Sequence, residues 1–110
     1  MSLKTIAAKI FAHRIAKRTN KWVNNPIETQ EKVFKSLIAK GAETKFGKDH
    51  NFKTIKKHSD FIAQVPVRDY EELKSYVNLA VEGQENILWP GKPLYFAKTS
   101  GTTSGAKYIP

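Results

Sequence analysis

The end of the chain holds its densest set of groups that can bind an anion. Residues 99–110 read TSGTTSGAKYIP and follow directly on the apolar run 94–97. Glycines allow backbone N–H groups to turn toward an anion, hydroxyls donate to phosphate oxygens, and a lysine adds a positive charge. These residue types in one short loop indicate a site for the phosphate groups of a nucleotide. An ordinary hairpin loop is rich in the same residues, so that alternative stays open.

The spacing excludes two common phosphate-binding patterns. A Walker A loop needs four residues between its glycines and then Lys-Ser/Thr, whereas three residues separate Gly101 from Gly105 and a tyrosine follows Lys107. A dinucleotide-binding fingerprint opens a helix, and here the pair 108–109 predicts a second strand instead. We therefore expect a loop that joins the strand 94–97 to another strand.

The elements that position this loop are predicted to be mostly helical. Apolar residues at three- and four-residue steps predict helices over 3–23, 26–40 and 69–82, and Asp69 with Glu72 forms a capping box at the start of the last. A shorter helical segment follows Ser59-Asp60. The second helix starts with Asn25 as its N-cap. The side chains expected to be buried on the two later helices are Ile27, Val33, Phe34, Leu37, Ile38, Tyr70, Leu73, Val77, Ala80 and Val81.

The middle of the chain offers no convincing catalytic or metal site. Residues 47–58 are polar and basic, with Phe52 among them and Phe46 directly before them. Two interpretations are open: the aromatic rings stack on nucleic-acid bases, or they enter the core beneath a surface connection, which we prefer. The histidines lack the spacing of metal ligands, and we expect all three to be solvated: His13, His50 and His58.

The formal net charge of +9 is concentrated in one helix. Six basic residues precede the first acidic one, Glu28, and the remainder of the 110 residues is only mildly basic. This placement argues against a nucleic-acid footprint over the whole surface. The 3–23 helix could pack its apolar stripe on the rest of the protein, dock on a membrane surface or serve as a targeting peptide. The chain has no cysteine and no apolar run long enough to span a bilayer.

The terminal loop resembles the phosphate loop of the adenylate-forming superfamily, whose pattern is Ser/Thr-Ser-Gly-Thr-Thr-Gly-x-x-Lys. Residues 99–103 match this pattern directly, and Gly105 and Lys107 match when Ser104 is counted as an extra residue. With that extra residue the loop is similar to one branch, the Gretchen Hagen family of acyl-acid amido synthetases, known for conjugating auxin and jasmonate to amino acids. Shorter segments follow the order of that family, so the resemblance covers roughly residues 27–110: 44–48, 60–61, 65–67, 70–71 and 87–89.

The resemblance implies an enzyme that activates a carboxylic acid with ATP and Mg²⁺ and transfers the acyl group to the amine of an amino acid. It implies phosphate contacts from six residues of this chain: Ser100, Gly101, Thr102, Thr103, Gly105 and Lys107. Thr99 and Ser104 are expected only to support the turn. No catalytic residue and no metal ligand is expected within these 110 residues, because the family's other nucleotide and metal motifs are not among them. A cytoplasmic location is implied as well.

The expected fold is mainly α with one or two short strands, as part of an α/β adenylate-forming domain. Residues 1–24 would form a basic amphipathic helix, and residues 25–110 the N-terminal part of that domain, ending at the phosphate loop. We expect such a part to be inactive alone and able to self-associate through surfaces meant for the rest of the sheet. The alternative is a small basic helical module that binds an anionic membrane or nucleic acid. A thioester-forming relative would carry a similar loop.

Overall fold

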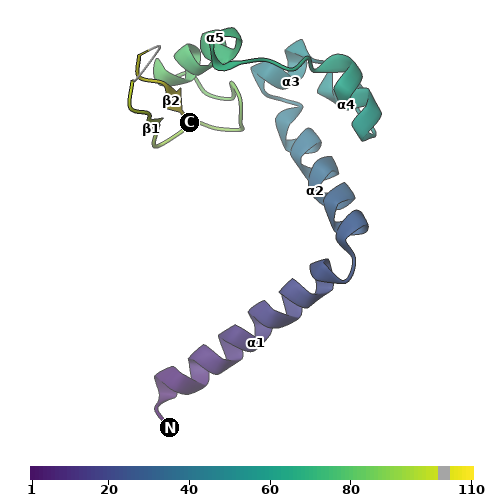
Figure 1. Cartoon of the computed structure of the whole chain (residues 1–110), viewed down its shortest axis with the longest axis vertical. Coiled ribbons are helices and arrows are strands. Elements are labelled where there is room, and N and C mark those ends of the chain that lie inside the picture. Colours follow the sequence, from purple (N-terminus) through teal and green to yellow (C-terminus); the bar gives the residue numbers. More distant parts are fainter. Residues whose placement is uncertain (102–104) are drawn as a thin grey trace. The chain divides into compact units, whose positions relative to one another are not determined.

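The computed structural model describes residues 1–101 and 105–110, and it divides into two compact units, Met1–Val33 and Phe34–Pro110. Each unit is described by itself. Figure 1 labels the elements along the chain, which is mainly helical with one two-stranded sheet in the described ranges. The predicted fold class, mainly α with one or two short strands, is therefore confirmed.

The first unit begins with α1, Leu3–Val23, whose bounds agree with the predicted helix. Ser2 caps it, because its hydroxyl accepts from the backbone nitrogen of Thr5. No side chain of α1 is buried. The helix α2, Pro26–Gly41, begins at the predicted proline. The Asn25 side chain turns back, and its amide donates to the carbonyl of Lys21 over 3.0 Å.

The buried face of α2 is smaller than predicted. Of the five residues expected inside, Ile38 is buried and Phe34 is half-buried, but Val33, Leu37 and Ile27 are exposed, the last at 82%. The reason is that the core contacts only the C-terminal part of α2. Ile38 joins Ala42, Phe52 and Ile55 there, and partly buried aromatic and aliphatic side chains surround them: Phe34, Phe46, Phe61 and Val65.

Three short helices form the rest of this core: α3 (Lys45–Asp49), the 3-10 helix η1 (Phe52–Thr54) and α4 (His58–Gln64). Phe46 and Phe52 both pack into the core, as predicted for a surface connection with inward-facing rings. The prediction of solvated histidines is wrong for His50, which is 6% exposed. Its ring stacks on Phe46 and its Nδ1 lies 2.7 Å from the Phe46 carbonyl oxygen, so the apolar ring provides the burial.

The turn from α2 into α3 is fixed by Thr44, which is 1% exposed. Its hydroxyl donates to the carbonyl of Gly41 over 2.7 Å and accepts from the backbone nitrogen of Gly47 over 3.0 Å. A Cβ atom on Gly47 would lie 2.0 Å from the Gly41 carbonyl oxygen. The two segments therefore approach closely only because residue 47 has no side chain.

The helix α5, Tyr70–Val81, contacts the hairpin. Asp69 and Glu72 form the predicted capping box, with both hydrogen bonds at 3.0 Å. Val77 and Ala80 are buried as expected, whereas Val81 is exposed because it lies at the last position of the helix, beyond the packed face. Gly83 follows in the left-handed region with a φ of +93° and ends the helix.

Three hydrogen bonds join α3 to α5 and to the loop that leads to the hairpin. The Tyr76 hydroxyl of α5 donates to Asp49 over 2.9 Å. A hydrogen bond from Lys45 and then this one from Tyr76 lower the pKa of Asp49, while burial and the bond to Asp49 raise the pKa of Tyr76. The first backbone nitrogens of α3 also donate to the loop that leads to the hairpin, Lys45 to Asn86 over 2.7 Å and Phe46 to Ile87 over 3.0 Å.

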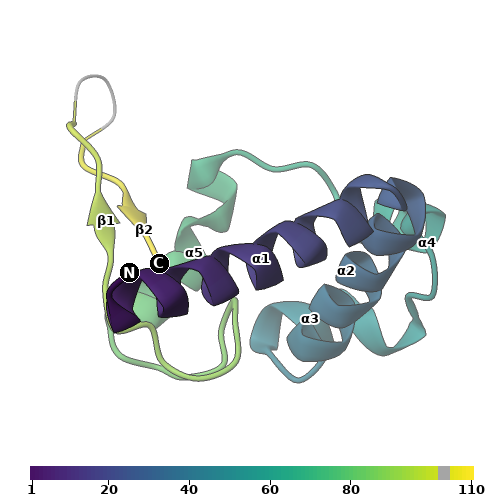
Figure 2. The ribbon, with the colours of Figure 1, turned by 90° about the horizontal axis from the view of Figure 1, so that it is seen from below.

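The hairpin consists of β1, Ala97–Lys98, and β2, Tyr108–Ile109, which pair antiparallel with Ala97 opposite Ile109. Figure 2 shows the two strands side by side. The strand predicted at 94–97 is displaced toward the C-terminus, because Leu94 and Tyr95 lie outside the ladder and are 83% and 87% exposed. The expectation that the loop joins strand to strand is confirmed.

Candidate functional site

The two arms of the terminal loop are joined at Thr99 and Lys107. The backbone nitrogen of Thr99 donates to the carbonyl of Lys107 over 2.9 Å. The nitrogen of Lys107 in turn donates to the Thr99 hydroxyl over 3.0 Å. Thr99 therefore supports the turn, as the resemblance implied, and it holds the backbone of Lys107 on the returning arm.

Beyond Thr99 and Lys107 the backbones of the two arms of the loop remain close together. A Cβ atom on Gly101 would lie 2.8 Å from the nitrogen of Ala106 and 2.8 Å from the carbonyl carbon of Gly105. Real Cβ atoms do not come so near to backbone atoms, so only glycine fits at residue 101. Gly105 has a φ of +80°, a conformation that costs other residues about 1–2 kcal/mol. Both glycines are thus required by the path of the loop.

Tyr70, at the first turn of α5, connects the helix to the hairpin. Its hydroxyl accepts from the backbone nitrogen of Tyr108 over 2.9 Å and donates to the Tyr108 carbonyl over 3.4 Å. The Lys107 ammonium nitrogen lies 5.3 Å from the centre of the Tyr70 ring, within the range of a cation–π contact. One side chain therefore contacts both the backbone of β2 and the charged end of the lysine.

The structure brings together four of the six predicted phosphate contacts. Ser100, Gly101 and Gly105 are exposed on the loop, and Lys107 is half-buried at its base. Thr102 and Thr103 lie outside the described residues, as does Ser104. The described loop residues include a hydroxyl, two glycines and an ammonium group, which are groups that can bind an anion.

The charged side chains in the segment that carries the loop, from Gly91 onward, are all lysines. No acidic side chain follows Glu85, and three lysines do: Lys92, Lys98 and Lys107. Lys98 lies on β1 with its nitrogen 5.9 Å from the centre of the Tyr108 ring. An anion that approaches the hairpin therefore meets cations and no competing carboxylate of this segment.

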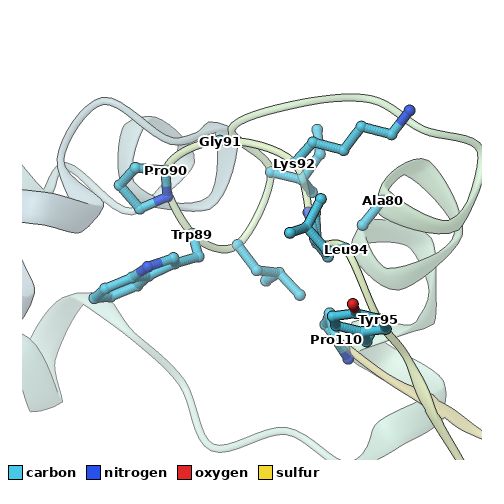
Figure 3. A pocket seen from close by; sticks show the side chains of 11 residues that line it. Ala80, Trp89, Pro90, Gly91, Lys92, Leu94, Tyr95 and Pro110 are labelled. Carbon is cyan, nitrogen blue, oxygen red and sulfur yellow. The ribbon is translucent and has the colours of Figure 1, made fainter.

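An apolar groove of about 640 Å³ lies beside the foot of the hairpin (Figure 3). The Trp89 ring lies at one end, and Leu94, Tyr95 and Pro110 lie at the other, with Ala80 of α5 behind them. Among the described loop residues, none of the predicted phosphate contacts lines this groove. Its apolar lining does not suit a phosphate group, so it is distinct from the candidate anion site.

Over residues 1–101 and 105–110, no group of three or more His, Asp or Glu residues is placed to hold a metal ion. In the same ranges no helix is both long enough and apolar enough to cross a membrane.

The residue that sequence reasoning missed is Tyr70. The periodic pattern assigned it to the buried stripe of its helix, but its hydroxyl contacts a strand 38 positions later. The sequence does place Tyr70 on the first turn of the helix, because it directly follows the N-cap Asp69. No local pattern identified Tyr108 as its partner.

The sequence of the chain is similar to that of known proteins. Residues 15–110 match the N-terminal domain of the GH3 family. Indole-3-acetic acid-amido synthetase GH3.4 of Arabidopsis thaliana is 27% identical over 86 residues, which are 77% of this chain. The chain spans 14% of the length of that relative. No solved structure matches the chain. Because the family match takes in nearly the whole chain, including the hairpin, the chain belongs to the GH3 (Gretchen Hagen) family and corresponds to sequence of its N-terminal domain.

Proposed function

We propose that this chain is the N-terminal part of an ATP-dependent acyl-acid amido synthetase and that the hairpin loop holds the phosphate groups of ATP. Membership of the GH3 family supports the enzyme class, and the amido synthetase relative supports the type of reaction. The observation that carries the phosphate assignment is the loop itself. Thr99, Gly101 and Gly105 define its path, and Lys107 stands at its base.

In the proposed reaction a carboxylate oxygen of the acid attacks the α-phosphorus of ATP, and the bond to pyrophosphate breaks. The amine of an amino acid then attacks the acyl carbonyl, and AMP leaves. The six loop residues would hold the β- and γ-phosphates during the first step, and Mg²⁺ would enter with ATP. Donors and a cation fixed around the leaving group lower the barrier because they bind the charge that develops on pyrophosphate.

Lys107 has the sharpest role in this proposal. Its ammonium would contact a phosphate oxygen, and a hydrogen bond between charged groups is worth about 1.5–3 kcal/mol. Its removal should therefore weaken ATP binding by about 10- to 100-fold. Lys9, on α1, lies outside the residues that match the family and serves as the matched control.

The test uses the full-length enzyme, meaning the product of the complete reading frame that contains these residues. We expect acid-dependent exchange of labelled pyrophosphate into ATP, lost at working ATP concentrations in Lys107→Ala and retained in Lys9→Ala. The isolated 110-residue chain should show no exchange. Unchanged ATP affinity in Lys107→Ala would contradict the role of that lysine, and exchange by the 110-residue chain would contradict its inactivity.

A second experiment identifies the group that accepts the acyl moiety. With an activating acid present, we expect an amide product when amino acids are supplied and no thioester when coenzyme A is supplied instead. A thioester product would keep the adenylation step but overturn the amido transfer. If the full-length protein gives no exchange with any acid, yet binds anionic vesicles or nucleic acid with steep salt dependence, the basic-module alternative is favoured.

A further inference from the structure

The contacts of Tyr70 form a bridge between a well-anchored helix and a weakly anchored hairpin. The strands β1 and β2 are two residues long each, and a two-stranded ladder of this size is marginal in water by itself. The helix α5 is capped at Asp69 and buries Val77 and Ala80, so its first turn is a firm point of attachment. Tyr70 is the residue that extends from this turn to the returning strand.

We propose that Tyr70 is a positioning residue for the phosphate loop, acting through Lys107 and the backbone of Tyr108. This inference rests on the function proposed above, because it assigns a role within the same site. The hydroxyl holds both backbone polar groups of Tyr108, which fixes the returning arm against α5. The ring holds the ammonium of Lys107, which limits where that flexible side chain can reach.

The hydroxyl and the ring of Tyr70 contact different groups, so substitutions can remove their contacts separately. The hydroxyl contacts only backbone atoms in these two bonds, so its effect should reach the whole returning arm. The ring contacts the charge of Lys107, and a cation–π contact depends on that charge. Tyr70→Phe removes the first contact and keeps the second. Tyr70→Leu removes both.

We expect changes at Tyr70 to alter the affinity for ATP and to leave the affinity for the acid nearly unchanged. In the full-length enzyme, Tyr70→Phe should raise the KM for MgATP about fivefold, as expected for the loss of a hydrogen bond. Tyr70→Leu should raise it by about a further two- to fivefold through loss of the ring contact. The KM for the acid and kcat at saturating ATP should change less than twofold. The control is Tyr95→Leu, which removes a tyrosine that is 87% exposed and outside the loop.

The Lys107→Ala background distinguishes positioning from general support of the fold. In that background Tyr70→Phe and Tyr70→Leu should have the same affinity for ATP, because the ring has no ammonium to contact. Both should still bind ATP more weakly than Lys107→Ala alone, because the hydroxyl is lost. If Tyr70→Leu fails to fold, the comparison of Tyr70→Phe with wild type still carries the test. Equal ATP affinity in wild type and Tyr70→Phe would overturn the inference.

A separate measurement keeps this inference distinct from the proposed function. Hydrogen exchange of the Tyr108 amide should be faster in Tyr70→Phe than in wild type, because the amide loses its acceptor. If wild type shows no acid-dependent exchange of pyrophosphate, the proposed function fails. If wild type is active but neither Tyr108 exchange nor ATP affinity changes in Tyr70→Phe, the positioning role alone fails.

Discussion

Gly101 and Ala106 approach so closely that a Cβ atom on residue 101 would lie 2.8 Å from the backbone nitrogen of Ala106. This contact is between backbone segments, so no flexible side chain can move aside to relieve it. The two arms of the loop must separate before any larger residue fits at position 101. The width of the candidate phosphate site is therefore set at this point.

Gly101→Ala should abolish most ATP binding in the full-length enzyme. We expect an affinity loss above about tenfold, since separating the arms displaces several donors at once and each is worth about 1 kcal/mol. Isothermal titration with MgATP measures it. The thermal unfolding midpoint should fall little, because Gly101 and the described residues opposite it, Gly105 and Ala106, are exposed. ATP binding like that of wild type would contradict the close approach.

At Gly105 the backbone conformation, and not a steric contact, favours glycine. Its φ is +80°, and a Cβ atom there would meet nothing within 4 Å. Gly105→Ala should cost about 1–2 kcal/mol of conformational strain, or about a 5- to 30-fold loss of ATP affinity if strain relief opens the loop. Gly105→Asn should cost less, because asparagine enters the left-handed region more readily. The order Gly, Asn, Ala in affinity checks the prediction, and Asn weaker than Ala would contradict it.

Local signals in the sequence were sufficient to place the three long helices α1, α2 and α5, whereas α3 and the 3-10 helix η1 were not predicted. The capping box of Asp69 and Glu72 marks the start of α5 because both hydrogen bonds close within three residues. The start of α2 at Pro26 and the end of α5 at Gly83 follow from backbone preferences of single residues. Such features depend only on residues close in the chain, so they can be predicted from a single sequence.

Burial and the details of the site were harder to predict because they depend on distant partners. Val33 and Leu37 fit a helical stripe, yet the described core meets only the end of α2. His50 is buried because Phe46 happens to stack on it. The glycine spacing indicated a loop, but the contact of Tyr70 with Tyr108 spans 38 positions and has no periodic signal.

Thr44 offers a test of the turn between α2 and α3. Thr44→Val keeps the shape of the side chain but leaves the Gly47 nitrogen without its acceptor in a buried place. We expect a loss of about 2 kcal/mol in the free energy of unfolding. Thr44→Ser keeps both hydrogen bonds and should lose about 1 kcal/mol for the missing methyl group. Urea unfolding followed by circular dichroism compares them, and a loss in Thr44→Val no larger than that in Thr44→Ser would contradict the role given to the hydroxyl.

Asp60 gives the start of α4 a dependence on pH. Its carboxylate accepts from the backbone nitrogens of Lys56 and Lys57 at 3.0 and 3.1 Å, and these bonds lower its pKa from 3.8. Because the folded pKa lies below the unfolded one, the stabilising contribution is complete above the unfolded value and is lost as pH falls through the folded value.

Asp60→Asn keeps an oxygen acceptor of the same shape but has no charge to titrate. The wild-type chain should be more stable than this variant at neutral pH, and the difference should shrink as pH falls below 3.8. Urea unfolding at several pH values measures the two free energies. A difference that is constant down to the lowest pH would show that the carboxylate charge does not contribute.

Thr99 links the hairpin to the proposed chemistry through one hydroxyl. Thr99→Val removes the acceptor for the Lys107 nitrogen and leaves the backbone bond from residue 99 to the Lys107 carbonyl. Residue 99 then makes one hydrogen bond to Lys107 instead of two. We expect ATP affinity in the full-length enzyme to fall about fivefold, as for one hydrogen bond of about 1 kcal/mol. Thr99→Ser retains the hydroxyl and should bind ATP like wild type. If serine and valine weaken ATP binding equally, the hydroxyl is not what holds Lys107 in place, and the lysine must be positioned by Tyr70 and the backbone alone.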